Sequence, residues 1–337
     1  MKERKTTMFK RFDNIYGIDL GSSNTVIFER GRGVVLSEPS VVAVDGETGA
    51  LLAVGEQARS MIGRAPEHVV IDYPLRNGVI ANFEMTGSML KTFMKKIQGR
   101  SSLWRSMQVR ISVPCGITSV QKRAVEEAML QTGARRAVAV EEPLAAAIGA
   151  GLPIAEPVGR LVLDIGGGTS QAAVLSLGGI VASRTLPRGG LSIDRDIMDF
   201  VKRRYNVEIG ERTAEEIKVR IATASASAAE RAMEIRGRDA ISGLPRAIRL
   251  SSRDVSAIVE EFLQSIVEAI RSTIEACPPE LAGDVVEQGI MLCGGGALLE
   301  GIDERLRSET NIPVYIAEQP LECTAIGTGA ILSCKAP

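Results

Sequence analysis

Two runs of small residues, each following an aspartate, are the parts of the sequence most capable of chemistry. Asp19 precedes the turn GSSNT at residues 21–25, and Asp164 precedes the turn GGGT at residues 166–169. A turn without large side chains lets backbone N–H groups converge on an anion. Two such turns facing each other could hold the β- and γ-phosphates of a nucleotide. The candidate phosphate ligands are Gly21, Ser22, Ser23, Asn24, Gly166, Gly167, Gly168 and Thr169.

The two aspartates suit a metal ion beside these phosphates. Mg²⁺ is a hard cation that keeps several of its waters, so carboxylates often hold it through water. Asp19 and Asp164 therefore predict a Mg²⁺ site. Neither the Walker pattern GxxxxGK[ST] nor GxGxxG is present, which excludes the P-loop and Rossmann interpretations.

A single glycine-rich turn is more often an ordinary tight hairpin, because glycine is the default residue of strained turns. Here the pattern occurs twice. Residues 15–28 and 161–175 each run from an apolar segment through an aspartate and a small-residue turn to a second apolar segment, which predicts a β-hairpin. A second pair of similar segments, residues 113–151 and 292–329, follows in the same order. Two pairs in register indicate duplicated α/β lobes.

Bulk properties narrow the classes of function. A chain of 337 residues fits two domains or lobes. The net charge of −1 and the 4% of aromatic residues give no footprint for nucleic acid. The five cysteines form no CxxC pair, which is typical of reduced thiols in the cytosol. No apolar run reaches the roughly 18–20 residues of a membrane span, so we expect any membrane contact to be peripheral.

The helical patterns fit an alternation of strands and helices. Apolar residues between 255 and 276 recur at steps of three and one, which places them on one helical face that ends before Pro278. Residues 118–132 predict a second amphipathic helix that ends at Gly133.

Three motifs carry a resemblance to a known superfamily. The segments DLGSSNT at 19–25, DIGGGT at 164–169 and GGGALL at 294–299 resemble the two phosphate motifs and the adenosine motif of the actin/sugar-kinase/heat-shock-chaperone ATPases. Within that superfamily the chain resembles the MreB family over nearly its whole length. The most specific stretches are residues 74–83, 209–218, 234–239 and 243–245.

The resemblance implies an α/β, actin-like ATPase fold. It consists of two duplicated ribonuclease-H-like lobes around a nucleotide cleft, each with a smaller inserted subdomain. We expect a basic, amphipathic tail at residues 1–12. Lobe I would span 13–155 with an insertion at about 38–78, and lobe II would span 156–335 with an insertion at about 191–250.

The resemblance also implies a function. The chain would be a slow ATPase, with ATP and Mg²⁺ as cofactors, that polymerises with itself into membrane-associated filaments and organises cell-wall synthesis to determine rod shape. Its expected place is the cytoplasm, at the inner face of the cytoplasmic membrane. Expected partners are the membrane surface, cell-wall elongation proteins and a membrane-anchored filament adaptor, with no nucleic acid. The alternative is a sugar-type small-molecule kinase of the same superfamily, which would need a carboxylate base where Gln121 stands.

Further site residues follow from the resemblance. Glu215 and Lys218 would contact the ribose and adenine, although their spacing also fits an exposed helical ion pair. The segment formed by Gly295, Gly296 and Ala297 would pass close under the adenine.

The catalytic set implied by the resemblance is Gln121, Asp164 and Thr169. Gln121 stands where the family usually has a glutamate that orients the attacking water, and it also completes a Thr118-x-x-Gln121 helix capping box. Glu142 would contact the metal through water, or would serve only as a carboxylate at a helix start. The second hairpin departs from the family by having Ser170-Gln171 in place of the usual Thr-Glu.

Two segments could reach a membrane. Leu103 and the sole tryptophan, Trp104, lie between serines and arginines and match a two-residue apolar loop that MreB proteins insert. Phe9 belongs to the basic N-terminal segment, which could form a short anchor or a frayed, solvated tail.

Overall fold

Both predicted hairpins form, and each begins a five-stranded sheet. The computed structural model describes residues 15–98, 107–225 and 227–331. The sheet orders are β3-β2-β1-β9-β10 and β13-β12-β11-β17-β18. In each sheet the first three strands are antiparallel and the last two run parallel to the central strand. The duplication predicted from the sequence is therefore confirmed.

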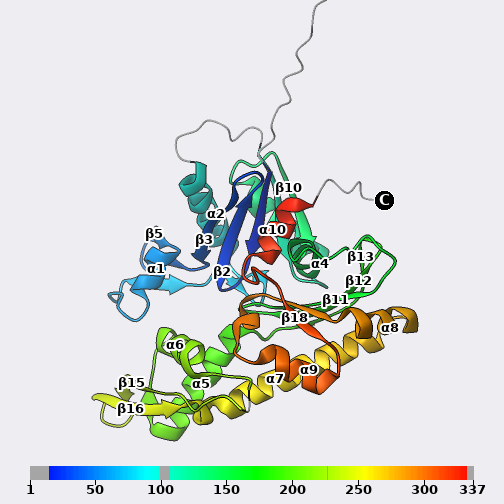
Figure 1. Ribbon diagram of the computed structural model, residues 1–337. Coiled ribbons are helices and arrows are strands. Elements are labelled where there is room, and N and C mark those ends of the chain that lie inside the picture. Colours follow the sequence, from blue (N-terminus) through cyan, green and yellow to red (C-terminus); the bar gives the residue numbers. More distant parts are fainter. Residues whose placement is uncertain (1–14, 99–106, 226, 332–337) are drawn as a thin grey trace, which may run out of the picture.

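Lobe I is the upper part of Figure 1, and lobe II is the lower part. The strands of the first sheet are β1 (Ile15–Leu20), β2 (Asn24–Glu29), β3 (Gly33–Pro39), β9 (Gln108–Val113) and β10 (Arg136–Glu141). Its helices are α2 (Phe83–Gln98), α3 (Ser119–Leu130) and α4 (Glu142–Gly149). Between β3 and α2 the chain forms β4 (Val42–Asp45), β5 (Leu51–Val54), α1 (Glu56–Met61), β6 (Val69–Asp72), β7 (Leu75–Arg76) and β8 (Val79–Ile80).

Lobe II has a sheet of the same topology as that of lobe I, and it contains more helices. Its sheet has β11 (Arg160–Ile165), β12 (Ser170–Ser176), β13 (Gly179–Leu186), β17 (Ile290–Cys293) and β18 (Val314–Ile316). The segment between β13 and the long helix α7 (Ser252–Glu275) holds α5 (Gly190–Tyr205), β14 (Val207–Glu208), α6 (Glu211–Ile221), β15 (Ala232–Asp239) and β16 (Pro245–Ser251). After α7 come α8 (Pro279–Gln288), the 3₁₀ turn η2 (Gly295–Leu298), α9 (Ile302–Thr310) and α10 (Cys323–Ala330).

The two inserted segments are anchored differently. In lobe I, α1 and the sheet β5-β4-β6 enclose a small apolar cluster of their own, with Val41, Ala43 and Ala53 buried in it. In lobe II, Ile217 of α6 and Ile235 of β15 belong to the same large apolar cluster as the central sheet. Both insertions lie on the left of Figure 1. The sequence boundaries predicted for lobes and insertions remain predictions.

Helices α4 and α10 cross between the lobes. A Cβ on Gly327 of α10 would lie 1.8 Å from the carbonyl oxygen of Ala145, and one on Gly149 of α4 would lie 1.8 Å from that of Cys323. Only glycine permits so close an approach of two helix backbones. As a result α10, red in Figure 1, packs against β1 and β2 of lobe I although it follows lobe II in the chain.

The amphipathic helices fit their sequence patterns. Helix α7 buries Val255, Val259, Phe262 and Ile266 along one face, as predicted. Ser251 N–H donates to Asp254 Oδ2 (2.7 Å) at its start, which satisfies a free backbone donor of the first turn. None of the helices in the described ranges is long and apolar enough to span a membrane.

Candidate functional site

A cavity of about 650 Å³ lies between the lobes, and both hairpin turns line it. Every predicted phosphate ligand contributes to the lining, from Gly21, Ser22, Ser23 and Asn24 on one side to Gly166, Gly167, Gly168 and Thr169 on the other. The carboxyl groups of Asp19, Glu142 and Asp164 line the same cavity. The structure thus brings together residues that are far apart in the sequence, while their contact with a nucleotide stays a prediction.

The two turns touch each other, and this contact explains part of their glycine content. A Cβ on Gly167 would lie 2.5 Å from Ser23 Cβ, and one on Gly168 would lie 2.6 Å from Ser22 Oγ. Each turn is closed by its own backbone bond, from Gly21 N to Asn24 O (3.1 Å) and from Gly166 N to Thr169 O (2.8 Å). Glycine is therefore required where the two hairpins meet, as well as for approach of an anion.

Three carboxyl groups, buried in Glu142 and Asp164 and partly buried in Asp19, give the cavity lining an unusual electrostatic character. Burial raises the pKa of Asp19 to about 6, although a hydrogen bond from Ser112 Oγ (2.8 Å) opposes the shift. Burial and the charge of Asp19 raise the pKa of Asp164 to about 7, opposed by Thr324 Oγ1 (3.2 Å). Burial and both aspartates also raise the pKa of Glu142 well above its ordinary value, while Gln171 opposes this.

These carboxyl groups fit a divalent cation that is bound through water molecules. A cation would favour their ionised forms, because it supplies the opposite charge that the site lacks. Yet no group of three or more His, Cys, Asp or Glu side chains in the described ranges is arranged to ligate a metal directly. The donor set suits a hydrated Mg²⁺ that is bound mainly by phosphate oxygens and water.

The raised pKa values predict how stability without ligands changes with pH. The folded chain holds protons on Asp19 and Asp164 up to about pH 6 and 7, whereas the unfolded chain releases them near pH 4. The native state binds more protons within this window, so these groups make the free energy of unfolding fall as pH rises from about 4 to 7. Asp164→Asn should flatten that slope in urea unfolding measured without nucleotide. Equal slopes for both proteins would contradict the assignment.

Gln121 lies at the start of α3, where its side chain takes part in the helix cap. Its Oε1 accepts from the backbone N–H of Thr118 (2.9 Å), and its own N–H donates to Thr118 Oγ1 (3.2 Å). The capping box at the start of α3 is confirmed. Gln121 does not line the cavity. Its amide oxygen is used in the cap, and its predicted role in orienting water stays a prediction. Glu142, the first residue of α4, occupies the cavity wall instead.

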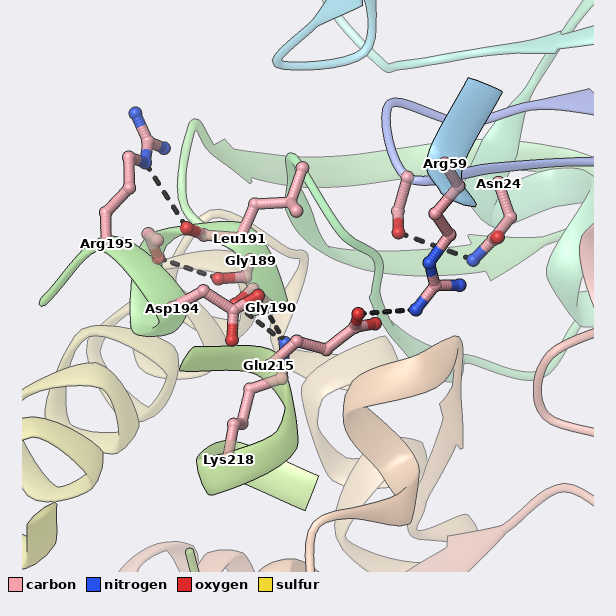
Figure 2. A network of polar contacts seen from close by, with 11 residues as sticks. Asn24, Arg59, Gly189, Gly190, Leu191, Asp194, Arg195, Glu215 and Lys218 are labelled. Carbon is pink, nitrogen blue, oxygen red and sulfur yellow. Dashed lines mark hydrogen bonds and ion pairs between the residues drawn. The ribbon is translucent and has the colours of Figure 1, made fainter. Parts of the chain in front are cut away.

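Glu215 and Lys218 line the mouth of the cavity, but each already has a partner (Figure 2). Lys218 Nζ donates to Asp194 Oδ2 (2.7 Å) and to the carbonyl oxygen of Gly190 (3.0 Å). Glu215 accepts from Arg59 Nη2 of the lobe I insertion (2.5 Å), across the cleft. The alternative of an ion pair between Glu215 and Lys218 is thus wrong, and their contact with ribose and adenine remains a prediction.

The glycines and the alanine of the segment predicted to pass under the adenine have different surroundings. Gly295 and Gly296 line the cavity. A Cβ on Gly296 would lie 2.1 Å from Ile165 Cγ2, so packing within lobe II already requires glycine there. Ala297 is 2% exposed and its side chain belongs to the lobe II core, so the contact of this segment with adenine stays a prediction.

Known proteins similar to this chain identify its family. A family model described as MreB/Mbl protein matches residues 13–336. The chain belongs to the MreB/Mbl family. The cell shape-determining protein Mbl of Bacillus subtilis (strain 168) is 46% identical over 316 residues, which cover 94% of this chain and 95% of Mbl. The cell shape-determining protein MreB of Escherichia coli (strain K12) is 45% identical over 325 residues, which cover 95% and 94%.

Solved structures agree with this MreB/Mbl assignment. The crystal structure of MreB5 of Spiroplasma citri bound to ADP has a TM-score of 0.89 and 35% sequence identity, and covers 94% of this chain and 95% of that chain. The MamK double helical filament, at 23% identity and a TM-score of 0.77, covers 93% and 97% and shows the likeness of fold. The predicted actin-like fold is confirmed.

Sequence reasoning missed several residues of this MreB/Mbl cavity. Thr324 of α10 donates to Asp164, and Ser112 at the end of β9 donates to Asp19. Gln171 of β12 donates to Glu142 Oε2. Only Gln171 carried a signal in the sequence, because it lies two residues after Thr169 in the same hairpin and departs from the usual family residue.

Proposed function

We propose that this MreB/Mbl chain is an actin-like cytoskeletal ATPase that assembles into filaments and determines rod cell shape by organising cell-wall synthesis. The observation that carries the proposal is the contact of two glycine-rich turns in a cavity that three carboxyl groups also line. Support also comes from relatives named as cell shape-determining proteins and from MreB5 structures bound to ADP and to AMPPNP. We further propose that hydrolysis is slow.

The residues of the cavity have distinct parts in the proposed reaction. The backbone N–H groups of the two turns hold the β- and γ-phosphates in line with the attacking water. Bound Mg²⁺ would neutralise charge on the phosphate oxygens. Asp19 and Asp164 are the residues that would hold that ion, through water. Glu142 orients the attacking water and accepts its proton as the bond from the β,γ-bridging oxygen to the γ-phosphorus breaks, which yields ADP and phosphate.

The alternative, a sugar-type kinase, is not favoured. The curated relatives that match the chain over about 95% of its length are cell shape-determining proteins. Within the cavity, Gln171 holds Glu142 near the two aspartates, which supports a carboxylate that serves hydrolysis.

Nucleotide-dependent assembly tests the proposal. Addition of Mg²⁺ with ATP or AMPPNP should move most of the chain into the pellet of an ultracentrifuge run, while the chain without nucleotide stays in the supernatant. Phosphate release should occur without any sugar. Failure to sediment with either nucleotide would contradict the filament proposal, and phosphate transfer to an added sugar would favour the kinase.

We also propose a peripheral membrane contact through Leu103 and Trp104, with Phe9 of the tail as a second anchor. All three lie outside the described residues, so the proposal rests on the sequence. One buried apolar side chain contributes about 2 kcal/mol, too little to hold a protomer alone, but many protomers in a filament bind together. The filaments would lie in the cytoplasm along the inner face of the cytoplasmic membrane, with cell-wall elongation proteins and a membrane-anchored adaptor as partners.

The loop can be tested by pelleting filaments with anionic phospholipid vesicles. Leu103→Ser combined with Trp104→Ser should lower the vesicle-bound fraction by about tenfold or more, since two contacts per protomer are lost. A matched control is Leu177→Ser combined with Val286→Ser, which removes two exposed apolar side chains of lobe II (72% and 54% exposed). Normal pelleting of the first double variant would rule out the loop.

A further inference from the structure

Gln171 connects the two lobes at the floor of the cavity. It lies on β12 of lobe II, opposite Asp164 in the β11–β12 ladder, and is 1% exposed. Its side chain reaches the segment between β9 and α3 of lobe I, where Oε1 accepts from the backbone N–H of Cys115 (2.7 Å). On its other side, Nε2 donates to Glu142 Oε2 at the start of α4.

The carbonyl oxygen and the NH₂ group of the Gln171 side chain therefore both have hydrogen-bond partners. An amide is suited to the position because it carries a donor and an acceptor together, whereas an ionised carboxylate can only accept. Thr185 Oγ1 lies 3.4 Å from Gln171 Oε1 and 3.2 Å from the carbonyl oxygen of Cys115, so Cys115 is held at both its N–H and its carbonyl group. Buried polar groups pair in this way because a lost partner costs free energy inside the protein.

We infer that Gln171 is a positioning residue for hydrolysis. By holding Glu142 Oε2, it leaves Oε1 as the oxygen that orients the attacking water and takes its proton. By holding both Cys115 and Glu142 of lobe I, it ties that carboxylate to the β11–β12 strand pair of lobe II, which carries the phosphate turn at residues 166–169. The water-orienting group and the phosphate-binding turn are thereby fixed relative to each other. This inference rests on the proposed function.

A purely steric role for Gln171 makes a different prediction from a positioning role. Methionine has nearly the same size and removes both hydrogen bonds. Glutamate still accepts from Cys115, and in contact with Glu142 the two buried carboxyl groups share one proton, so a hydrogen bond between them remains. Positioning through hydrogen bonds therefore predicts loss with methionine and rescue with glutamate, whereas space filling predicts that both behave alike.

The experiment measures kcat, KM and amide exchange in the full-length chain. Gln171→Met should lower kcat for phosphate release by about tenfold or more with KM changed less than about twofold, because ground-state binding is kept. Gln171→Glu should restore kcat to within about threefold of wild type. Hydrogen exchange at the Cys115 amide should be faster in Gln171→Met and close to wild type in Gln171→Glu. As a matched control, Gln264→Met removes an exposed glutamine of α7 that donates to Glu260 (3.1 Å) and does not line the cavity.

Several outcomes would overturn the inference. They are a kcat for Gln171→Met within about twofold of wild type, a Gln171→Glu variant as slow as Gln171→Met, a change confined to KM, and unchanged exchange at Cys115. Wild-type protein that binds nucleotide but releases no phosphate would overturn the proposed function itself, and the inference with it.

Discussion

Replacing Glu142 with glutamine should slow phosphate release by about 100-fold or more while the affinity for ADP stays close to wild type. Loss of a positioned proton acceptor has effects of this order. Glu142 is suited to the role because it is buried in the cavity wall, and because burial and the two aspartates raise its pKa well above the ordinary value. Glutamine keeps the shape but cannot take a proton. Single-turnover phosphate release measures the rate, and titration with fluorescent ADP measures binding.

Two control variants make this result specific. Glu141→Gln changes the adjacent carboxylate, which is exposed and makes no side-chain capping bond to α4, so its rate should match wild type. Gln121→Ala breaks the capping box of α3 and should lower the free energy of unfolding by about 1 kcal/mol without a comparable loss of rate. If Gln121→Ala lost the rate and Glu142→Gln kept it, the roles given to these two residues would be reversed.

Gly167→Ala should weaken nucleotide binding by about 10- to 100-fold. The new Cβ would lie 2.5 Å from Ser23 Cβ, so the two hairpin turns could no longer meet. Overpacking of this kind costs about 1–3 kcal/mol, which corresponds to about one to two powers of ten in affinity. Thermal unfolding measured with and without Mg-ADP reports the loss, because a ligand raises the melting temperature only as far as it binds the folded state.

The matched control for this variant is Gly283→Ala in α8. A Cβ there has no heavy atom within 4 Å, and alanine within a helix should stabilise the chain by about 1 kcal/mol. Gly283→Ala should therefore keep the full nucleotide response. If Gly167→Ala unfolds cooperatively and still gains the wild-type increase in melting temperature from Mg-ADP, the contact between the turns is not needed for binding.

The parts of the fold that the sequence predicted well are local. Asp19 and Asp164 each stand at the end of a strand before a small-residue turn, and turn chemistry together with alternating apolar segments is enough to predict a hairpin. The capping box at Thr118 is equally local. Because the pattern occurs twice, the sequence also predicted that the two turns face one another, and the cavity confirms that they meet.

Long-range packing explains what the sequence could not predict. The donation from Thr324 to Asp164 depends on α10 crossing α4, which in turn depends on backbone contacts at Gly149 and Gly327 that resemble ordinary turn glycines in the sequence. The burial of the Ala297 side chain in the lobe II core likewise depends on the 3₁₀ turn, which its motif did not predict. The ion pair of Lys218 with Asp194 was also not predicted, because Asp194 lies on another helix, 24 residues earlier in the chain.

The central claim is that both turns hold one Mg-nucleotide between the lobes. A crystal structure with Mg²⁺ and AMPPNP tests it most directly. The account predicts phosphate oxygens about 3 Å from backbone N–H groups of both the 21–25 and the 166–169 turns, with the metal reached by Asp19 and Asp164 through water. Density for the nucleotide outside the cavity, or phosphates bound by only one of the two turns, would contradict it.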